Sequence, residues 1–293
     1  MNKMLVIGAS GLIGNRFMEL ARNKFEVYGT YNSHQIEGNN LYKLNVVNRA
    51  DTFNLIKKIS PDVVIDTHFL NSVDYCETHR EEAWSVNVEG AKNVAEACID
   101  YGSKLVFFST DYVFDGKKMI YSERDKARPL NYLGINKATV EQMLELLDMN
   151  HITVRTSVVY GKGGLNKVNF VFWLIQKLKA GEKVSIVTDQ KNNPTFADNI
   201  VEQVLYLLKK NKRGIYHITG RECLSRYDFS LKIADVFGLN PDLINPITSV
   251  ELHQMAKRPT VVNMSVAKVE RETGLKQDDV LTGLKKYKIQ LEM

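Results

Sequence analysis

The chain has 293 residues, 44% of them hydrophobic and 25% charged, which suits one large α/β domain or a domain with a smaller appendage. Its 39 basic and 34 acidic residues give a formal charge of +5. Because this excess is spread along the chain, it does not indicate nucleic acid and suits an anionic small molecule equally well. No run approaches the roughly 20 apolar residues of a membrane span, the start lacks a signal-peptide pattern, and three scattered cysteines favour free thiols. We therefore expect a cytoplasmic protein with no membrane partner.

The first half of the sequence alternates short β-rich runs with amphipathic helical segments. Helices are predicted over residues 14–23, 49–60 and 87–102, where apolar residues recur at helical spacing. The β-rich runs read as buried parallel strands and cover residues 3–9, 26–31, 62–67, 104–110 and 152–160. This alternation predicts an α/β fold with a doubly wound parallel sheet of the Rossmann type.

The pattern loosens in the second half. We predict helices over residues 169–181, 199–211 and 225–238, a strand over 214–220, a turn-rich connection at 192–199 and a loop over 239–252. We accordingly predict an NADP-binding Rossmann domain in residues 1–162 and a small, mainly substrate-binding α/β region in 163–293. Because no flexible linker separates them, the two should pack together with chain exchange, and the ligand should lie in the cleft between them.

A glycine-rich loop joins the first predicted strand to the first predicted helix. In "VIGASGLIGNRF", Gly8, Gly11 and Gly14 have GxxGxxG spacing. Small residues allow a sharp turn and a close approach to a pyrophosphate, whose charge then lies at the helix N-terminus. The loop therefore predicts dinucleotide binding, through Gly8, Ser10, Gly11, Leu12, Ile13 and Gly14.

The end of the second strand bears on the type of cofactor. The stretch "YGTYNSHQ" has no Asp or Glu to hold the 2′-hydroxyl of NAD. Its small polar side chains could instead bind the 2′-phosphate of NADP(H), or they could form a solvated turn. The residues in question are Thr30, Asn32, Ser33 and His34.

Seven motifs along the chain resemble one enzyme family. "GASGLIG", "STDYVFDG", "PLNYLGINK", "VRTSVVYG", "NPTFADN", "GIYHITG" and "KRP" occur in an order that resembles the dTDP-4-dehydrorhamnose reductase family of extended short-chain dehydrogenases/reductases. The similarity runs from about residue 3 to residue 285. It implies a Rossmann domain, NADPH, and reduction of a nucleotide-linked 4-keto-6-deoxysugar, as in rhamnose biosynthesis. Mg²⁺-assisted variants of the family are known, and no residue here identifies such a site.

The resemblance also implies roles for individual residues. Thr110 maps onto the hydroxyl that contacts the ketone oxygen, with Asp111 beside it as a substrate-site residue. Lys137 maps onto the lysine that binds the nicotinamide ribose and lowers the pKa of a catalytic tyrosine. The alternative is a purely structural role, in which Thr110 is a strand-end cap and Lys137 is a solvated helix residue.

The family's tyrosine is missing. Its position, four residues before Lys137, is occupied by Leu133, and Tyr132 lies one residue earlier, turned by about 100° around a helix. Tyr132 could serve as the catalytic acid if the helix start were irregular or bulged. Otherwise a water, Thr110 or another tyrosine, Tyr112 or Tyr160, could supply the proton, or the protein could bind nucleotides without the reaction, as a regulatory subunit.

Further residues are predicted on the substrate side. Arg155 suits a phosphate or carboxylate but could equally pair with an internal acid. Asn87 could be a site residue or a helix cap, and Arg258 in "KRP" could bind a diphosphate. Asn169 opens the helix that follows the site. The remaining partner calls are a nucleotide-sugar substrate, no nucleic acid and no metal, and a homodimer stays open.

Overall fold

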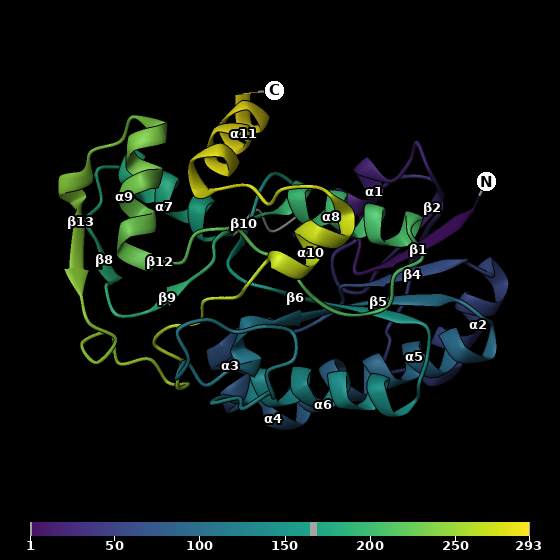
Figure 1. Cartoon of the computed structure of the whole chain (residues 1–293). Coiled ribbons are helices and arrows are strands. Elements are labelled where there is room, and N and C mark those ends of the chain that lie inside the picture. Colours follow the sequence, from purple (N-terminus) through teal and green to yellow (C-terminus); the bar gives the residue numbers. More distant parts are fainter. Residues whose placement is uncertain (1, 165–168, 293) are drawn as a thin grey trace.

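The computed structural model describes residues 2–164 and 169–292 and is built around a seven-stranded sheet (Figure 1). All neighbouring strands of this sheet are parallel. Their spatial order is β11 (Gly214–His217), β6 (His151–Thr156), β5 (Lys104–Thr110), β4 (Val63–Asp66), β1 (Lys3–Ile7), β2 (Glu26–Tyr31) and β3 (Leu41–Lys43). The chain reverses its direction of strand addition between β1 and β4, the point where doubly wound sheets bind ligands. The predicted Rossmann fold class is confirmed.

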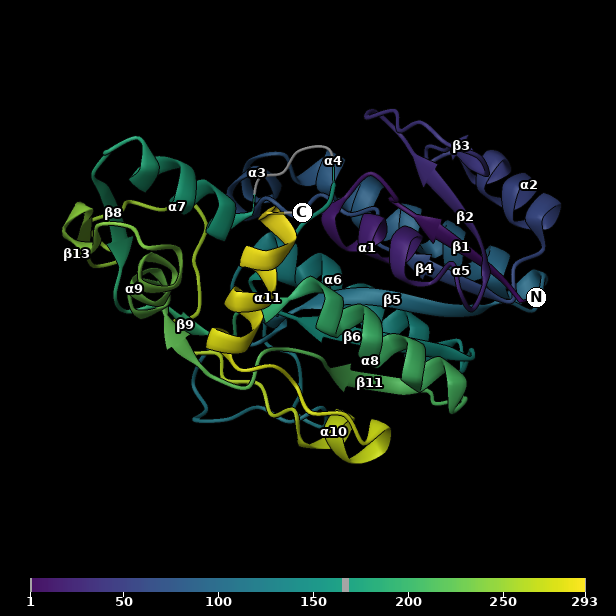
Figure 2. The same cartoon turned by 90° about the horizontal axis from the view of Figure 1, so that it is seen from above.

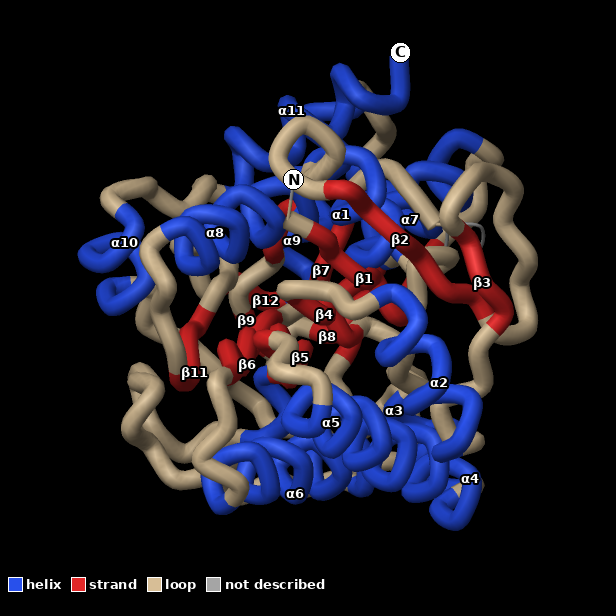
Figure 3. Tube along the Cα trace, turned by 90° about the vertical axis from the view of Figure 1, so that its right-hand side faces the viewer, coloured by secondary structure: helices blue, strands red, loops and turns tan. Residues whose placement is uncertain are grey.

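Helices cover both faces of the sheet (Figure 3). One face carries α1 (Leu12–Leu20) and α8 (Ala197–Lys209), which pack against each other, with α10 (Ala267–Thr273) beside α8. The other face carries α2 (Arg49–Ile59), α5 (Gly90–Asp100) and α6 (Tyr132–Leu146). The near-continuous apolar strands are buried between these layers, as expected for a parallel sheet covered on both sides.

A smaller lobe lies beyond the carboxyl ends of the strands (Figure 2). It contains α7 (Phe170–Lys179), α9 (Arg226–Phe237) and α11 (Val280–Glu292), together with the pair β8 (Val184–Val187) and β13 (Ile244–Ile247). Its own core includes Val171, Phe229 and Leu284, which are fully buried. However, α8, β11 and α10 follow residue 163 and still pack with the main sheet. The chain therefore passes between the two units more than once.

The remaining elements are short. They are α3 (Val73–Thr78), α4 (Arg80–Trp84), a π-helical turn (Ser85–Glu89), the 3₁₀ turns Asp111–Val113 and Pro241–Leu243, and the strand pairs β7 (Val159–Tyr160) with β10 (Thr195–Phe196) and β9 (Lys191–Asn192) with β12 (Leu224–Ser225). Among the described residues, no helix is long and apolar enough to cross a membrane.

Two predicted segments differ from the structure. The strand predicted over residues 152–160 is broken at Val158, whose φ of +46° is strained for a β-branched residue. The turn sends β7 out of the main sheet to pair with β10. The loop predicted over residues 239–252 contains β13, where Pro246 is tolerated because the strand pairs on one side only, with β8.

Candidate active site

The glycine loop forms an anion cradle at the N-terminus of α1. Gly8 has a φ of +86°, and a Cβ on Gly14 would lie 2.3 Å from the carbonyl oxygen of Gly8, so both positions require glycine. Gly11 is the N-cap of α1 and provides no side-chain cap, and the first turn has no acidic residue. The backbone amides of this turn are therefore open to an anion, which is what the pyrophosphate of a dinucleotide needs.

A cavity of about 430 Å³ extends from this loop across the carboxyl ends of the central strands. Gly11, Leu12, Ile13 and Gly14 line one end. The rest of the lining includes Thr110, Asp111, Tyr112, Leu133, Lys137, Asn169 and Arg226. The structure thus brings the cofactor loop and most of the predicted reaction residues to one cleft.

Thr110 and Asp111 lie where β5 ends. The Thr110 hydroxyl donates to Oδ1 of Asp111 at 3.0 Å and accepts from the backbone N–H of Tyr112 at 3.3 Å. Ser157 donates to Oδ2 of the same carboxylate at 2.5 Å. Burial raises the pKa of Asp111, and the hydrogen bonds from Ser157 and Thr110 oppose that rise. The Thr110 hydroxyl is therefore held at the cleft by hydrogen bonds to Asp111 and Tyr112.

Lys137 projects from α6 toward the sheet and is only 2% exposed. Its Nζ donates to the carbonyl oxygen of Phe108 at 2.7 Å and lies 2.9 Å from the centre of the Phe69 ring. Burial lowers the pKa of Lys137 well below its usual value, while Asp66 and Glu141 oppose the shift through their charges. The ammonium group is therefore anchored on one side and shielded by an aromatic face on the other.

Leu133 takes the position of the missing tyrosine. It lies one helical turn before Lys137 on the same face of α6, lines the cleft and is 3% exposed. The helix starts regularly at Tyr132, with Asn131 as N-cap accepting from the N–H of Gly134. No π-type bulge rotates Tyr132 toward the cleft.

Tyr132 is consequently not a residue of the cleft. Its ring lies 5.1 Å from the guanidinium carbon of Arg80, and Tyr132 is absent from the lining. The condition under which it would act as catalytic acid, an irregular helix start, is not met. Tyr160, the other distant alternative, is buried in the core of the small lobe.

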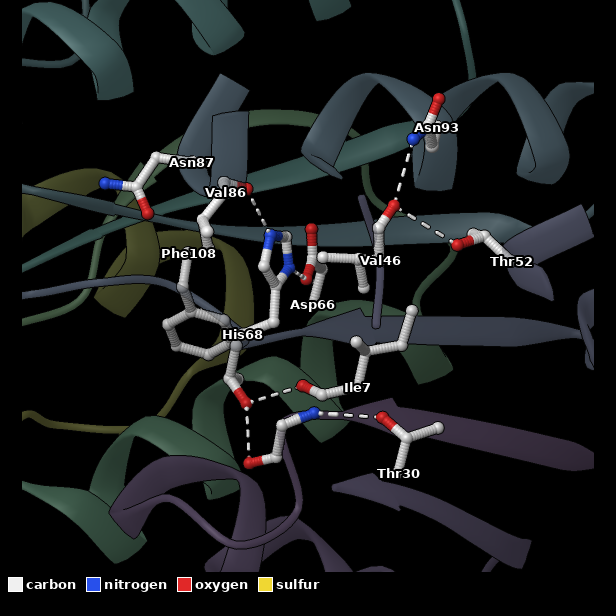
Figure 4. A network of polar contacts seen from close by, with 12 residues as sticks. Ile7, Thr30, Val46, Thr52, Asp66, His68, Val86, Asn87, Asn93 and Phe108 are labelled. Carbon is white, nitrogen blue, oxygen red and sulfur yellow. Dashed lines mark hydrogen bonds and ion pairs between the residues drawn. The ribbon is translucent and has the colours of Figure 1, made fainter. Parts of the chain in front are cut away.

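Buried polar contacts lie beside the glycine loop (Figure 4). Nδ1 of His68 contacts Oδ1 of Asp66, and Nε2 of His68 lies 2.9 Å from the carbonyl oxygen of Val86. Thr67 donates to the carbonyl oxygen of Ile7 at 2.8 Å. Thr30, predicted to face the cofactor ribose, is 1% exposed and accepts from the N–H of Gly8 at 3.3 Å. It shapes the loop from within.

The other residues predicted at the ribose end are placed differently. Asn32 and Ser33 are exposed just after β2, and the Ser33 hydroxyl lies 3.0 Å from Nδ1 of His34. Ser10 is half-buried in the glycine loop. These side chains are accessible at the rim of the sheet, where a 2′-phosphate would need donors.

Two residues predicted on the substrate side have internal partners and do not line the cleft. Asn87 is fully buried, and its side chain bonds both backbone groups of Leu70, at 2.8 and 3.1 Å. Arg155 faces Glu141, with Nη2 to Oε2 at 2.6 Å, and lines a separate cavity of about 980 Å³. Both polar side chains are satisfied by internal partners, and for Arg155 an internal acid was the alternative that the sequence left open.

Arg226 is a cleft residue that sequence reasoning missed. It is the first residue of α9, next to the N-cap Ser225, and it enters the cleft from the small lobe. The sequence predicts this helix. The one feature in the sequence that could have indicated a binding residue is the arginine next to the N-cap serine. Arg258 lies nearby, paired with Asp74 at 2.8 Å. Asn169 caps α7 by accepting from the N–H of Phe172 at 3.0 Å.

Comparison with known proteins agrees with this geometry. The profile of the family described as RmlD substrate binding domain matches residues 1–292. The chain belongs to this family. It is 32% identical to the dTDP-4-dehydrorhamnose reductase of Aggregatibacter actinomycetemcomitans over 306 aligned residues, with 100% of both chains covered. The resemblance to the dTDP-4-dehydrorhamnose reductase family that the motifs indicated is thereby confirmed.

Further similar proteins include a reductase structure and a protein of another name. The dTDP-4-dehydrorhamnose reductase of Bacillus anthracis in complex with NADP superposes with a TM-score of 0.89 and 28% identity, covering 99% of this chain and 100% of that one. Methionine adenosyltransferase 2 subunit beta of Danio rerio is 26% identical, covering 92% of this chain and 84% of its own. In residues 2–164 and 169–292, no group of three His, Cys, Asp or Glu side chains could hold a metal ion.

Proposed function

We propose that the protein reduces the keto group of a nucleotide-linked 4-keto-6-deoxysugar with NADPH. The observation that carries the proposal is the single cleft that joins the glycine cradle to Thr110 and Lys137. The similarity of the whole chain to a dTDP-4-dehydrorhamnose reductase supports this substrate class. The NADP complex of the Bacillus anthracis reductase supports the cofactor.

The chain's own residues prepare the cleft for this chemistry. NADPH would supply the hydride. The open amides at the start of α1 bind the pyrophosphate, and the exposed Asn32 and Ser33 contact the 2′-phosphate. Lys137 provides a positive charge at the nicotinamide ribose. The hydroxyl of Thr110, held by Asp111, orients the ketone oxygen, on which negative charge develops during hydride transfer.

The alternative of a catalytically silent nucleotide-binding protein is not favoured. The relative with the higher identity and the full coverage is named as a reductase, whereas methionine adenosyltransferase 2 subunit beta is more distant. The alternative arose because Leu133 occupies the position of the catalytic tyrosine. The cleft lacks that phenol but keeps the glycine loop, Thr110 and Lys137.

Oxidation of NADPH in the presence of dTDP-4-dehydrorhamnose tests the proposal. The wild type should turn over, and Lys137→Ala should lose most of this activity. Lys104→Ala is a matched control, because Lys104 is also a buried lysine but lies at the opposite end of β5, where its Nζ donates to Asn211 at 3.2 Å. A wild type no faster than Lys137→Ala would refute the proposal.

Two finer expectations remain predictions. Free cysteines at positions 76, 98 and 223 and the use of NADPH fit a cytoplasmic setting. The second expectation is a homodimer, which light scattering would detect as a mass twice that of the chain.

A further inference from the structure

The cleft keeps one tyrosine although the expected one is missing. Of the described residues that line it, Tyr112 alone carries a phenol. It follows Thr110 and Asp111 in the 3₁₀ turn after β5, so it belongs to the same short segment as the hydroxyl that orients the ketone. Reduction of a ketone needs a proton as well as a hydride, and a phenol is a suitable donor.

We propose that Tyr112 donates the proton to the ketone oxygen, in place of the tyrosine that Leu133 replaces. This inference rests on the proposed reductase function. It is carried by the position of Tyr112 in the cleft, its contact with the first turn of α6, and the two arginines beside its phenol.

Tyr112 is braced against the part of α6 that carries Leu133. A Cβ on Gly134 would lie 2.2 Å from the carbonyl oxygen of Tyr112, so the 3₁₀ turn and the helix touch at their backbones. The Tyr112 side chain packs on the apolar cluster that contains Leu133, Val73 and Ala256. The phenol of Tyr112 and the position of the missing phenol thus share one wall of the cleft.

Two guanidinium groups lie close enough to the Tyr112 phenol for their positive charges to favour its ionised form, those of Arg226, which lines the same cleft, and Arg258. Arg258 is held in place by Asp74, at 2.8 and 3.0 Å, and by the carbonyl oxygen of Ala256 at 2.9 Å. Fixed positive charge stabilises a phenolate as it forms. Lys137, which has this task in the resembling family, instead directs its ammonium group at Phe108 and Phe69.

The protonation state of Tyr112 suits an acid. Burial raises its pKa, as does the charge of Asp111, while Arg226 and Arg258 act in the opposite direction. The phenol therefore holds its proton at neutral pH. The two arginines stabilise the phenolate that forms when Tyr112 gives up its proton.

Hydride from NADPH forms a new C–H bond at the carbonyl carbon, and the π electron pair moves to oxygen. That oxygen takes the proton as the Tyr112 O–H bond breaks, which gives the hydroxyl of the reduced sugar. The remaining phenolate takes a proton from water before the next turnover.

Tyr112→Phe tests the proposal directly, with Tyr132→Phe as the matched control outside the cleft. We expect kcat of Tyr112→Phe to fall by about 10²–10⁴-fold, with KM and the NADPH dissociation constant unchanged. Tyr132→Phe should keep the wild-type kcat. The double variant Tyr112→Phe/Leu133→Tyr should regain turnover, because it returns a phenol to the family's position one turn before Lys137.

The outcomes separate the two proposals. An active wild type with an equally active Tyr112→Phe overturns the role of Tyr112 and leaves the reductase function standing. A wild type without turnover that still binds NADPH overturns both. If Tyr112→Phe fails to fold, the pH profile of kcat decides: the wild type and Leu133→Tyr should lose activity at different alkaline pH values, because different phenols would serve, and identical profiles would overturn the proposal.

Discussion

At the scale of single residues, Lys137 shows how a reaction site can cost stability. Its ammonium group is buried, and the one backbone acceptor and the aromatic face around it replace only part of the hydration that it has in the unfolded chain. Burial accordingly lowers the pKa of Lys137. The folded state therefore binds this proton less tightly than the unfolded state does, and the charged lysine destabilises the fold.

Lys137→Met should therefore give a more stable but inactive protein. The methionine fills a similar volume without a charge, and we expect the free energy of unfolding at neutral pH to rise by about 1 kcal/mol or more. This gain should shrink as pH rises through the lowered pKa toward about 10.4, the ordinary pKa of lysine, because the wild-type lysine then becomes neutral in the folded state. Denaturant unfolding at a series of pH values measures both effects. A variant less stable than the wild type at neutral pH would contradict this account.

At the scale of elements, the first turn of α6 depends on Gly134. Glycine within a helix usually costs about 1 kcal/mol relative to alanine, so Gly134→Ala would stabilise a free helix. Here the new Cβ would lie 2.2 Å from the carbonyl oxygen of Tyr112 and 2.9 Å from Cβ of Pro129. We expect Gly134→Ala to destabilise the protein by about 1–3 kcal/mol and to lower kcat, because the turn that carries Tyr112 must move.

Ile135→Ala is the matched control for this prediction. Ile135 is the next residue of the same helix and is 41% exposed, so its truncation should change the unfolding midpoint and kcat little. Thermal unfolding and turnover of the two variants should differ clearly. Equal stability of Gly134→Ala and the wild type would show that the helix and the 3₁₀ turn can separate without cost.

The same scale shows what the sequence could predict. Long apolar strands and amphipathic helices can be recognised from the periodicity of their apolar residues, and their alternation predicts the doubly wound sheet. Short elements do not: β7 leaves the sheet because Val158 adopts a positive φ, which nothing in "TSVVYG" requires. At the site, the anomaly at position 133 was visible in the sequence. The direction of Tyr132 and the entry of Arg226 from the small lobe depend on packing between distant segments.

At the scale of the whole molecule, β11 is the point where the second half of the chain closes the main sheet. His217 ends this strand, opposite Arg155 of β6, and is fully buried, with its Nε2 3.5 Å from Nη1 of Arg155. Burial, reinforced by the charge of Arg155, lowers the pKa of His217 to about 3. A proton on this ring would place two positive charges together inside the sheet edge.

Acid should therefore loosen this closure. Between about pH 6.5, the ordinary pKa of histidine, and pH 3, the unfolded chain binds a proton at His217 that the folded chain does not. The stabilising effect of the neutral ring is complete above this window and falls with pH inside it, by up to about 1.4 kcal/mol per pH unit. His217→Gln should flatten the decline of unfolding free energy over this range, whereas His253→Gln, in an exposed loop, should leave it unchanged. Parallel curves for wild type and His217→Gln would place the acid sensitivity elsewhere, among groups that do not join the second half of the chain to the sheet.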